Sequence, residues 1–248
     1  MSVLKRRSNN IKDGQYVIAF SDSRALIDIS KDCGMTWTRR QPSDLPNVNE
    51  YFFSNDRTRL AMSGDGRHIY CSCYMANVGL LRSTDFLETA EPFKPDNCYS
   101  VYSIACNGRG NLVAVVCQNS NNKYDLMLSG DYGKTWTKIT DSSFSARTLA
   151  ISYDGKYMVI EGGYSYSGAR ISADYGKTWA LKHSVIGNSF ALGLSSDGKY
   201  AIAQESSSPY RMFKSSDYLG SFTEINTAPL TSGIRANYRF IIMNKNRL

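Results

Sequence analysis

The 248-residue sequence has only two histidines, six prolines and no long apolar run. A membrane-spanning helix needs about 18 consecutive apolar residues, so we expect no membrane insertion. No segment sustains an apolar period of 3.6 residues, which argues against amphipathic helices. The six cysteines form no CxxC pair, and together with His68 and His183 they lack the spacing of a structural zinc site. We therefore expect free, mostly buried thiols, no metal and no cofactor.

The N-terminal segment MSVLKRRSNN is basic but has no apolar stretch after the basic residues. It is not typical of a signal peptide, and we expect a cytoplasmic protein, with a virion component as the alternative. The formal net charge of +7 permits an acidic partner. No nucleic-acid recognition motif or basic-aromatic cluster accompanies this charge, so nucleic acid is not the expected partner.

An eight-residue pattern, Ser-x-Asp-x-Gly-x-Thr-Trp, recurs along the chain. Three copies are complete, SKDCGMTW, SGDYGKTW and SADYGKTW, at 30–37, 129–136 and 172–179. Two copies are degraded: STDFLETA at 83–90 lacks the glycine and the tryptophan, and SSDYLGSF at 215–222 moves the glycine to Gly220. The five aspartates are 43 to 53 residues apart, a spacing that indicates a repeat architecture.

A second marker runs out of phase with these octapeptides. Five turns, each followed by an apolar run, have a glycine just before that run, at Gly14, Gly66, Gly110, Gly155 and Gly198. A glycine turn between two apolar runs predicts a hairpin. Each unit then contains four short antiparallel strands, the composition of one propeller blade. The sequence predicts an all-β fold, a β-propeller of four-stranded antiparallel blades, as a single domain over 1–248.

Five units predict five blades, with six as the alternative. The C-terminal strand, residues 235–248, is expected to complete the first blade and close the ring, which removes exposed sheet edges. The predicted units are 12–58, 59–102, 103–146, 147–190 and 191–234.

The octapeptide resembles the Asp-box, or BNR repeat, of sialidase-like and sortilin-like propellers. That resemblance covers the chain as a repeat pattern and implies a structural turn remote from any ligand site. A short aspartate accepts backbone hydrogen bonds within such a turn, and we expect the tryptophan to fill space between sheets. The residues assigned to these turns are Ser30, Asp32, Gly34, Trp37, Asp85, Ser129, Asp131, Gly133, Trp136, Ser172, Asp174, Gly176, Trp179 and Asp217.

The loops on the opposite side of the blades vary in sequence and are rich in Asn, Ser and Tyr. Variable loops on a rigid scaffold commonly bind ligands. Candidate binding residues there are the tyrosines Tyr124, Tyr164, Tyr166 and Tyr210, with packing between sheets as the alternative role. Glu161 is a further candidate, because with Glu205 it would supply a carboxylate pair of the glycosidase type.

We interpret the chain as a non-catalytic binding or assembly module that holds a protein partner on its loops. A glycan-binding surface or virion protein is the alternative. The resemblance to sialidases raises a third hypothesis, glycoside hydrolysis. That family carries an Arg-Ile-Pro type motif near its start, which this sequence lacks, and nothing indicates that Arg24, Arg170 and Arg211 converge.

Overall fold

The computed structural model describes residues 5–6, 15–21, 26–45, 48, 59–72, 79–139, 146–162, 168–183, 189–205 and 211–225. Within these ranges the regular structure is twenty β-strands and one short 3₁₀ helix, η1 (Pro42–Asp44). The strands of the first two sheets are β1 (Lys5–Arg6), β2 (Val17–Ser21), β3 (Leu26–Ser30), β4 (Thr38–Arg40), β5 (Arg59–Met62), β6 (Ile69–Ser72), β7 (Leu80–Ser83) and β8 (Glu91–Phe93). Those of the other three are β9 (Ser100–Cys106), β10 (Val113–Gln118), β11 (Tyr124–Ser129), β12 (Thr137–Lys138), β13 (Ala146–Ile151), β14 (Met158–Gly162), β15 (Ala169–Ser172), β16 (Ala180–His183), β17 (Ser189–Leu194), β18 (Ala201–Glu205), β19 (Met212–Ser215) and β20 (Thr223–Ile225).

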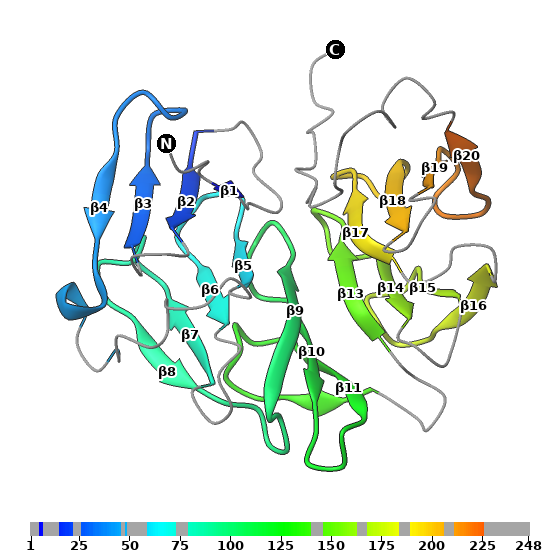
Figure 1. The fold of residues 1–248 in the computed structure, drawn as a ribbon, viewed down its shortest axis with the longest axis horizontal. Helices are drawn as coiled ribbons and strands as arrows, with labels where there is room; N and C mark the ends of the chain where they lie inside the picture. Colours follow the sequence, from blue (N-terminus) through cyan, green and yellow to red (C-terminus); the bar gives the residue numbers. More distant parts are fainter. Residues whose placement is uncertain are drawn as a thin grey trace.

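Consecutive strands pair antiparallel into five four-stranded sheets. The sheets are arranged around a common centre, with the first strand of each sheet nearest the centre and the fourth at the periphery (Figure 1). The chain is a five-bladed β-propeller, and the sheets are blades 1 to 5 in chain order.

The second strands of blades 2, 3 and 4 are apolar on both sides because each lies between two neighbouring blades. In β10, Val113 and Val115 pack against side chains of blade 2, whereas Ala114 and Val116 pack against blade 4. A strand buried on both faces reads as a continuous apolar run instead of an alternating one. This explains the apolar runs after the glycine turns.

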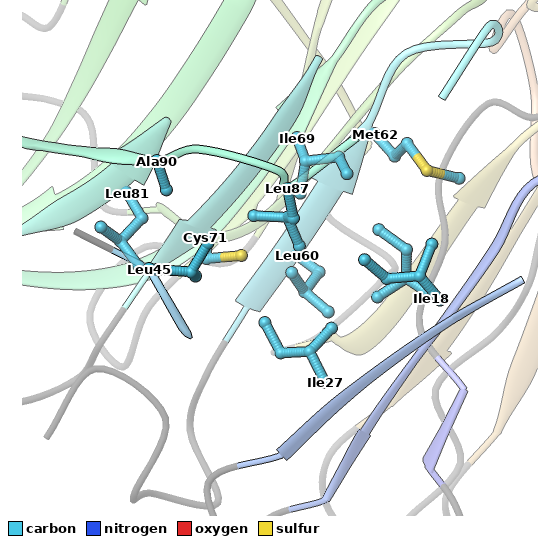
Figure 2. Packing of buried hydrophobic residues seen from close by; sticks show 11 residues of the cluster. Ile18, Ile27, Leu45, Leu60, Met62, Ile69, Cys71, Leu81, Leu87 and Ala90 are labelled. Atoms are coloured by element: carbon cyan, nitrogen blue, oxygen red, sulfur yellow. The ribbon is translucent and has the colours of Figure 1, made fainter. Parts of the chain in front are cut away.

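Four hydrophobic clusters fill the spaces between successive blades, from blades 1 and 2 to blades 4 and 5. In the first, Ile18 and Ile27 of blade 1 face Leu60 and Ile69 of blade 2, and Leu87 lies beside Leu60 and Ile69 (Figure 2). Each such side chain contributes about 1.5–3 kcal/mol through its burial. The core is therefore a series of interfaces between blades.

Blade 1 contains a strand that the sequence did not predict. We expected residues 235–248 to pair with β2, but β1 occupies that position, with Lys5 opposite Phe20 and Arg6 opposite Ala19. The two-residue strand has no apolar run or turn signal that would reveal it. Residues 235–248 lie outside the described part of the chain.

Candidate binding surfaces

Each octapeptide closes a turn between the third and fourth strands of its blade. In the copy at 129–136, Ser129 Oγ donates to Asp131 Oδ1 (2.8 Å) and accepts from the Gly133 N–H (2.8 Å). Asp131 also accepts from the Thr135 N–H and from Thr135 Oγ1, at 2.9 and 2.7 Å. Equivalent bonds occur in the other four copies.

These hydrogen bonds hold the aspartates in the ionised state. The Thr178 hydroxyl, with its N–H, lowers the pKa of Asp174 to about 2, and Thr36 does the same for Asp32. Ser221 takes the threonine's place and lowers the pKa of Asp217 to about 2. The carboxylate oxygens are therefore committed to donors of their own turns.

The glycine position of the octapeptide has a left-handed backbone in all five copies. Gly133 has φ 77° and Gly176 has φ 81°. In the degraded copies this position is Leu87 (φ 61°) and Leu219 (φ 67°). The shifted Gly220 does not take this role, because the Ser215 and Asp217 hydrogen bonds fix Leu219 at the left-handed position.

The two kinds of octapeptide fill the space beside the turn with different residues. Leu87 and Leu219 are completely buried, and the tryptophan positions hold Ala90 and Phe222. In the complete copies at 30–37 and 129–136 the indole lies over the glycine, and Trp136 Nε1 donates to the Gly133 carbonyl at 3.1 Å. In the copy at 83–90 the large side chain therefore stands at the glycine position, whereas in the copy at 215–222 both positions carry large side chains.

The tryptophans differ in burial. Trp136 packs on the cluster between blades 2 and 3 and stacks on Phe93 of blade 2, with ring centroids 5.8 Å apart, and Trp179 packs on the next cluster. Trp37 is instead 36% exposed and belongs to none of the clusters of described residues, which corrects our expectation that it fills space between sheets. The physical difference is that Trp136 and Trp179 each have the outer part of a preceding blade to pack on, whereas Trp37 lies in the first blade.

The glycine turns on the same face are joined from blade to blade by backbone hydrogen bonds. The Gly64 N–H donates to the Gly108 carbonyl, that of Gly108 to Tyr153, and that of Tyr153 to Ser196, at 2.7, 2.7 and 2.8 Å. The Tyr153 ring lies so close to Gly64 and Gly108 that a Cβ on either would be 2.3–2.5 Å from it. Tyr153 therefore reaches across the turns of blades 2 and 3.

We call this side of the propeller the turn face; its described parts are the five octapeptides and the glycine turns 63–68, 107–112, 152–157 and 195–200. The side with the loops between second and third strands and between blades is the loop face. On the turn face, six of the nine exposed large apolar side chains in the described ranges gather. They are Met35, Trp37, Tyr132, Tyr175, Tyr200 and Tyr218. The sequence did not predict this concentration, although the shared Asp-Tyr step of three octapeptides was a visible signal.

The candidate residues of the loop face have separate environments. Tyr124 is half-buried, and its ring contacts that of Tyr102 edge-on, with centroids 4.9 Å apart. This contact favours the alternative role for Tyr124, packing in the core. Glu161 is 1% exposed inside β14, between Thr148 and Ala169, and not on the loop surface. The remaining candidates, Tyr164, Tyr166 and Tyr210, lie outside the described residues, and so does the side chain of Glu205.

Tyr99 is an exposed aromatic residue of the loop face that the sequence reasoning missed. Its side chain is 47% exposed, and Lys94 Nζ lies 5.4 Å from the ring centroid. The loop is fixed on both sides, since the Tyr99 N–H donates to the Gln118 carbonyl (2.7 Å) and the Cys98 N–H to the Pro95 carbonyl (3.2 Å). Tyr99 is thus presented by an ordered backbone.

The adjoining loop 118–124 is organised by one side chain. Asn119 Oδ1 accepts from the backbone N–H groups of Asn121 and Lys123, at 2.9 and 3.1 Å. Its amide donates to Asp125 Oδ2 at 3.0 Å. The polar residues of this loop therefore shape the loop itself.

Five cysteines lie in the described ranges as free thiols, and Cys71, Cys98, Cys106 and Cys117 are buried. Burial raises the pKa of the Cys71 and Cys106 thiols well above the ordinary value. Cys33 is exposed. Among the described residues no three His, Cys, Asp or Glu side chains are grouped as metal ligands, and no helix there has the length and apolarity of a membrane span.

Comparison with known proteins supports the fold. No family model and no curated protein matches the sequence. Among solved structures, the Niastella koreensis GH74 enzyme is similar over 88% of this chain and 38% of its own, with TM-score 0.60 and 16% identity. The Xanthomonas campestris GH74 xyloglucanase matches over 90% and 39%, with TM-score 0.61 and 14% identity. A protein from Agrobacterium tumefaciens described as TolB matches over 90% and 81%, with TM-score 0.65 and 12% identity.

The chain spans about two fifths of the length of these GH74 enzymes. At such identities the similarity shows the propeller fold alone. The neighbours differ in function, so the function of this chain has to be argued from its own surfaces.

Proposed function

We propose that the chain is a non-catalytic propeller module that binds a protein partner through its loop face, and that its octapeptides are Asp-boxes that serve as structural turns. The hydrogen bonds within the octapeptides support the second part, because they engage the serine, the aspartate and a threonine, or Ser221 in blade 5, in the same way in every blade.

The observation that carries the binding role is the exposed ring of Tyr99 on a loop fixed by two backbone hydrogen bonds. Tyrosine is enriched among the residues that dominate protein–protein affinity. A loop that is already ordered loses little conformational entropy on binding. The Lys94 ammonium group lies beside the ring and is available to an acidic group of the partner at the edge of the contact.

The glycosidase alternative depended on Glu161. A side chain that is 1% exposed in the middle of a sheet does not reach a sugar on the loop surface, so we give Glu161 no catalytic role.

The test compares purified wild-type protein with Tyr99→Ala. Partners captured from the source cells are identified by mass spectrometry, and the affinity of the purified partner is then measured by calorimetry. We expect Tyr99→Ala to weaken binding at least 10-fold, as for the truncation of an interface anchor. Leu181→Ala is the matched control, because Leu181 is 58% exposed on the peripheral strand β16. Equal affinity of Tyr99→Ala and wild type would reject the loop-face site.

A further inference from the structure

Three tyrosines occupy the same position of consecutive octapeptides on the turn face. Tyr132, Tyr175 and Tyr218 belong to blades 3, 4 and 5, and their side chains are 37%, 48% and 45% exposed. Each has a left-handed backbone, with φ of 64°, 64° and 57°. An L-residue with a large side chain is unfavourable in this conformation, where asparagine or glycine is favoured. Turn formation alone therefore does not explain tyrosine at these positions.

Further aromatic rings continue this surface between the octapeptides. The Tyr218 ring contacts Tyr157 of blade 4, with centroids 5.1 Å apart, and Tyr132 contacts His68 of blade 2 at 4.6 Å. Lys156 and Lys199 lie over the rings of Tyr157 and Tyr200, at 5.3 and 5.4 Å from the centroids. The aromatic surface thus extends across neighbouring blades.

The charge of the turn face disfavours a polyanionic ligand. Its described residues include seven basic and nine acidic side chains, although the whole chain has a net charge of +7. The basic ones are Lys31, Arg67, Arg109, Lys134, Lys156, Lys177 and Lys199, and the acidic ones are Asp32, Asp65, Asp85, Glu88, Asp131, Asp154, Asp174, Asp197 and Asp217. Since the octapeptide aspartates stay ionised, they balance the basic side chains, and this face offers no excess of positive charge to nucleic acid or acidic polysaccharides.

A desolvated protein interface also fits this face poorly. Lys134 and Lys177 follow the tyrosines by two residues, and lysine is depleted from the cores of protein interfaces. A sugar ring that stacks on one tyrosine leaves the neighbouring charges in water, so it avoids that desolvation cost. Equivalent rings on successive blades also suit a polymer of repeated units.

We propose that the turn face of blades 3 to 5 binds a neutral polysaccharide, with Tyr132, Tyr175 and Tyr218 as stacking platforms for separate sugars of one polymer. This site is separate from the loop-face protein site proposed above.

The test is native electrophoresis in gels that contain a soluble neutral polysaccharide, hydroxyethyl cellulose, galactomannan or dextran, with anionic alginate in a parallel gel. The triple variant Tyr132→Asn, Tyr175→Asn, Tyr218→Asn removes the rings with a residue that accepts the left-handed backbone. We expect at least one neutral polymer to retard the wild type, and the triple variant to lose at least 10-fold in association constant. Tyr99→Ala should be retarded like the wild type, which separates this proposal from the loop-face site.

Thermal unfolding establishes that the variants fold. If the triple variant does not fold, the single variant Tyr175→Asn is tested in its place. Tyr175 has no ring partner among the described aromatic contacts, so its replacement disturbs no such contact. We expect Tyr175→Asn to lose at least 3-fold in association constant. The proposal is overturned by absence of retardation of the wild type in all three neutral gels, by retardation in alginate alone, or by full retardation of the tyrosine variants.

Discussion

The octapeptides at 129–136 and 83–90 make the same hydrogen bonds but fill the adjacent core differently. In both, the serine bridges the aspartate and the backbone two residues beyond it, and the threonine closes the turn on the aspartate. In the first, glycine leaves space that a tryptophan covers. In the second, Leu87 enters the core directly and Ala90 replaces the tryptophan. Ser, Asp and Thr therefore specify the turn, whereas the glycine and tryptophan positions of these two copies exchange side-chain volume.

The largest expected loss of stability comes from removing the buried leucine side chain of the turn at 83–90. Leu87→Gly should lower the free energy of unfolding by about 3 kcal/mol, because removing a buried leucine leaves a cavity between blades 1 and 2. Relief of the left-handed backbone offsets only about 1 kcal/mol. Urea unfolding monitored by circular dichroism measures the difference.

Adding the tryptophan sharpens this comparison. The double variant Leu87→Gly, Ala90→Trp reproduces the arrangement of Gly133 and Trp136, so we expect it to be more stable than Leu87→Gly alone. A double variant as unstable as the single one, in the same urea titration, would show that the two positions do not exchange volume.

The aspartates should matter equally in both kinds of turn. Asp174→Ala and Asp85→Ala each remove an acceptor of several hydrogen bonds, and each should cost about 1–2 kcal/mol of unfolding free energy. The exposed Lys177→Ala is the control and should change stability by less than about 0.5 kcal/mol. A difference of more than about 1 kcal/mol between the two aspartate variants would contradict a shared role, since it exceeds the spread of one hydrogen bond.

The parts of the molecule that local sequence determines were predictable, and those that depend on neighbouring blades were not. Apolar runs after glycine turns predicted the hairpins, and the repeat predicted five blades. The position of Leu219 was missed because Gly220 looked like the displaced glycine, although a leucine that gains core burial tolerates the backbone strain. The exposure of Trp37 and Tyr175 could not be predicted, because the same motif is covered or open depending on which blade packs beside it.

Acid should weaken the turns through the same carboxylates. The folded pKa of Asp174 is about 2, below the unfolded value, so its stabilisation is present above about pH 4 and is lost as the pH falls through about 2. Thr178→Val removes the hydroxyl hydrogen bond that lowers the pKa of Asp174 most. In this variant the free energy of unfolding should therefore fall less steeply between about pH 4 and about pH 2. Thr178→Ser should retain the slope, because Ser221 serves Asp217 in the same way. Equal slopes for Thr178→Val and wild type, measured by urea titrations at several pH values, would refute the assignment.

The smallest expected effect separates the turn from the surface it presents. Tyr175 has a left-handed backbone at φ 64°, which costs a tyrosine about 1 kcal/mol and costs asparagine less. Its ring is 48% exposed, so its removal loses little packing. We therefore expect Tyr175→Asn to leave the unfolding free energy unchanged or raise it by up to about 1 kcal/mol. Tyr175→Ala should be the less stable of the two, because alanine lacks the ring and still disfavours the left-handed backbone. If both variants instead lose the same stability, the tyrosine is present for packing; if asparagine is tolerated, the ring is retained for what it contacts outside the fold.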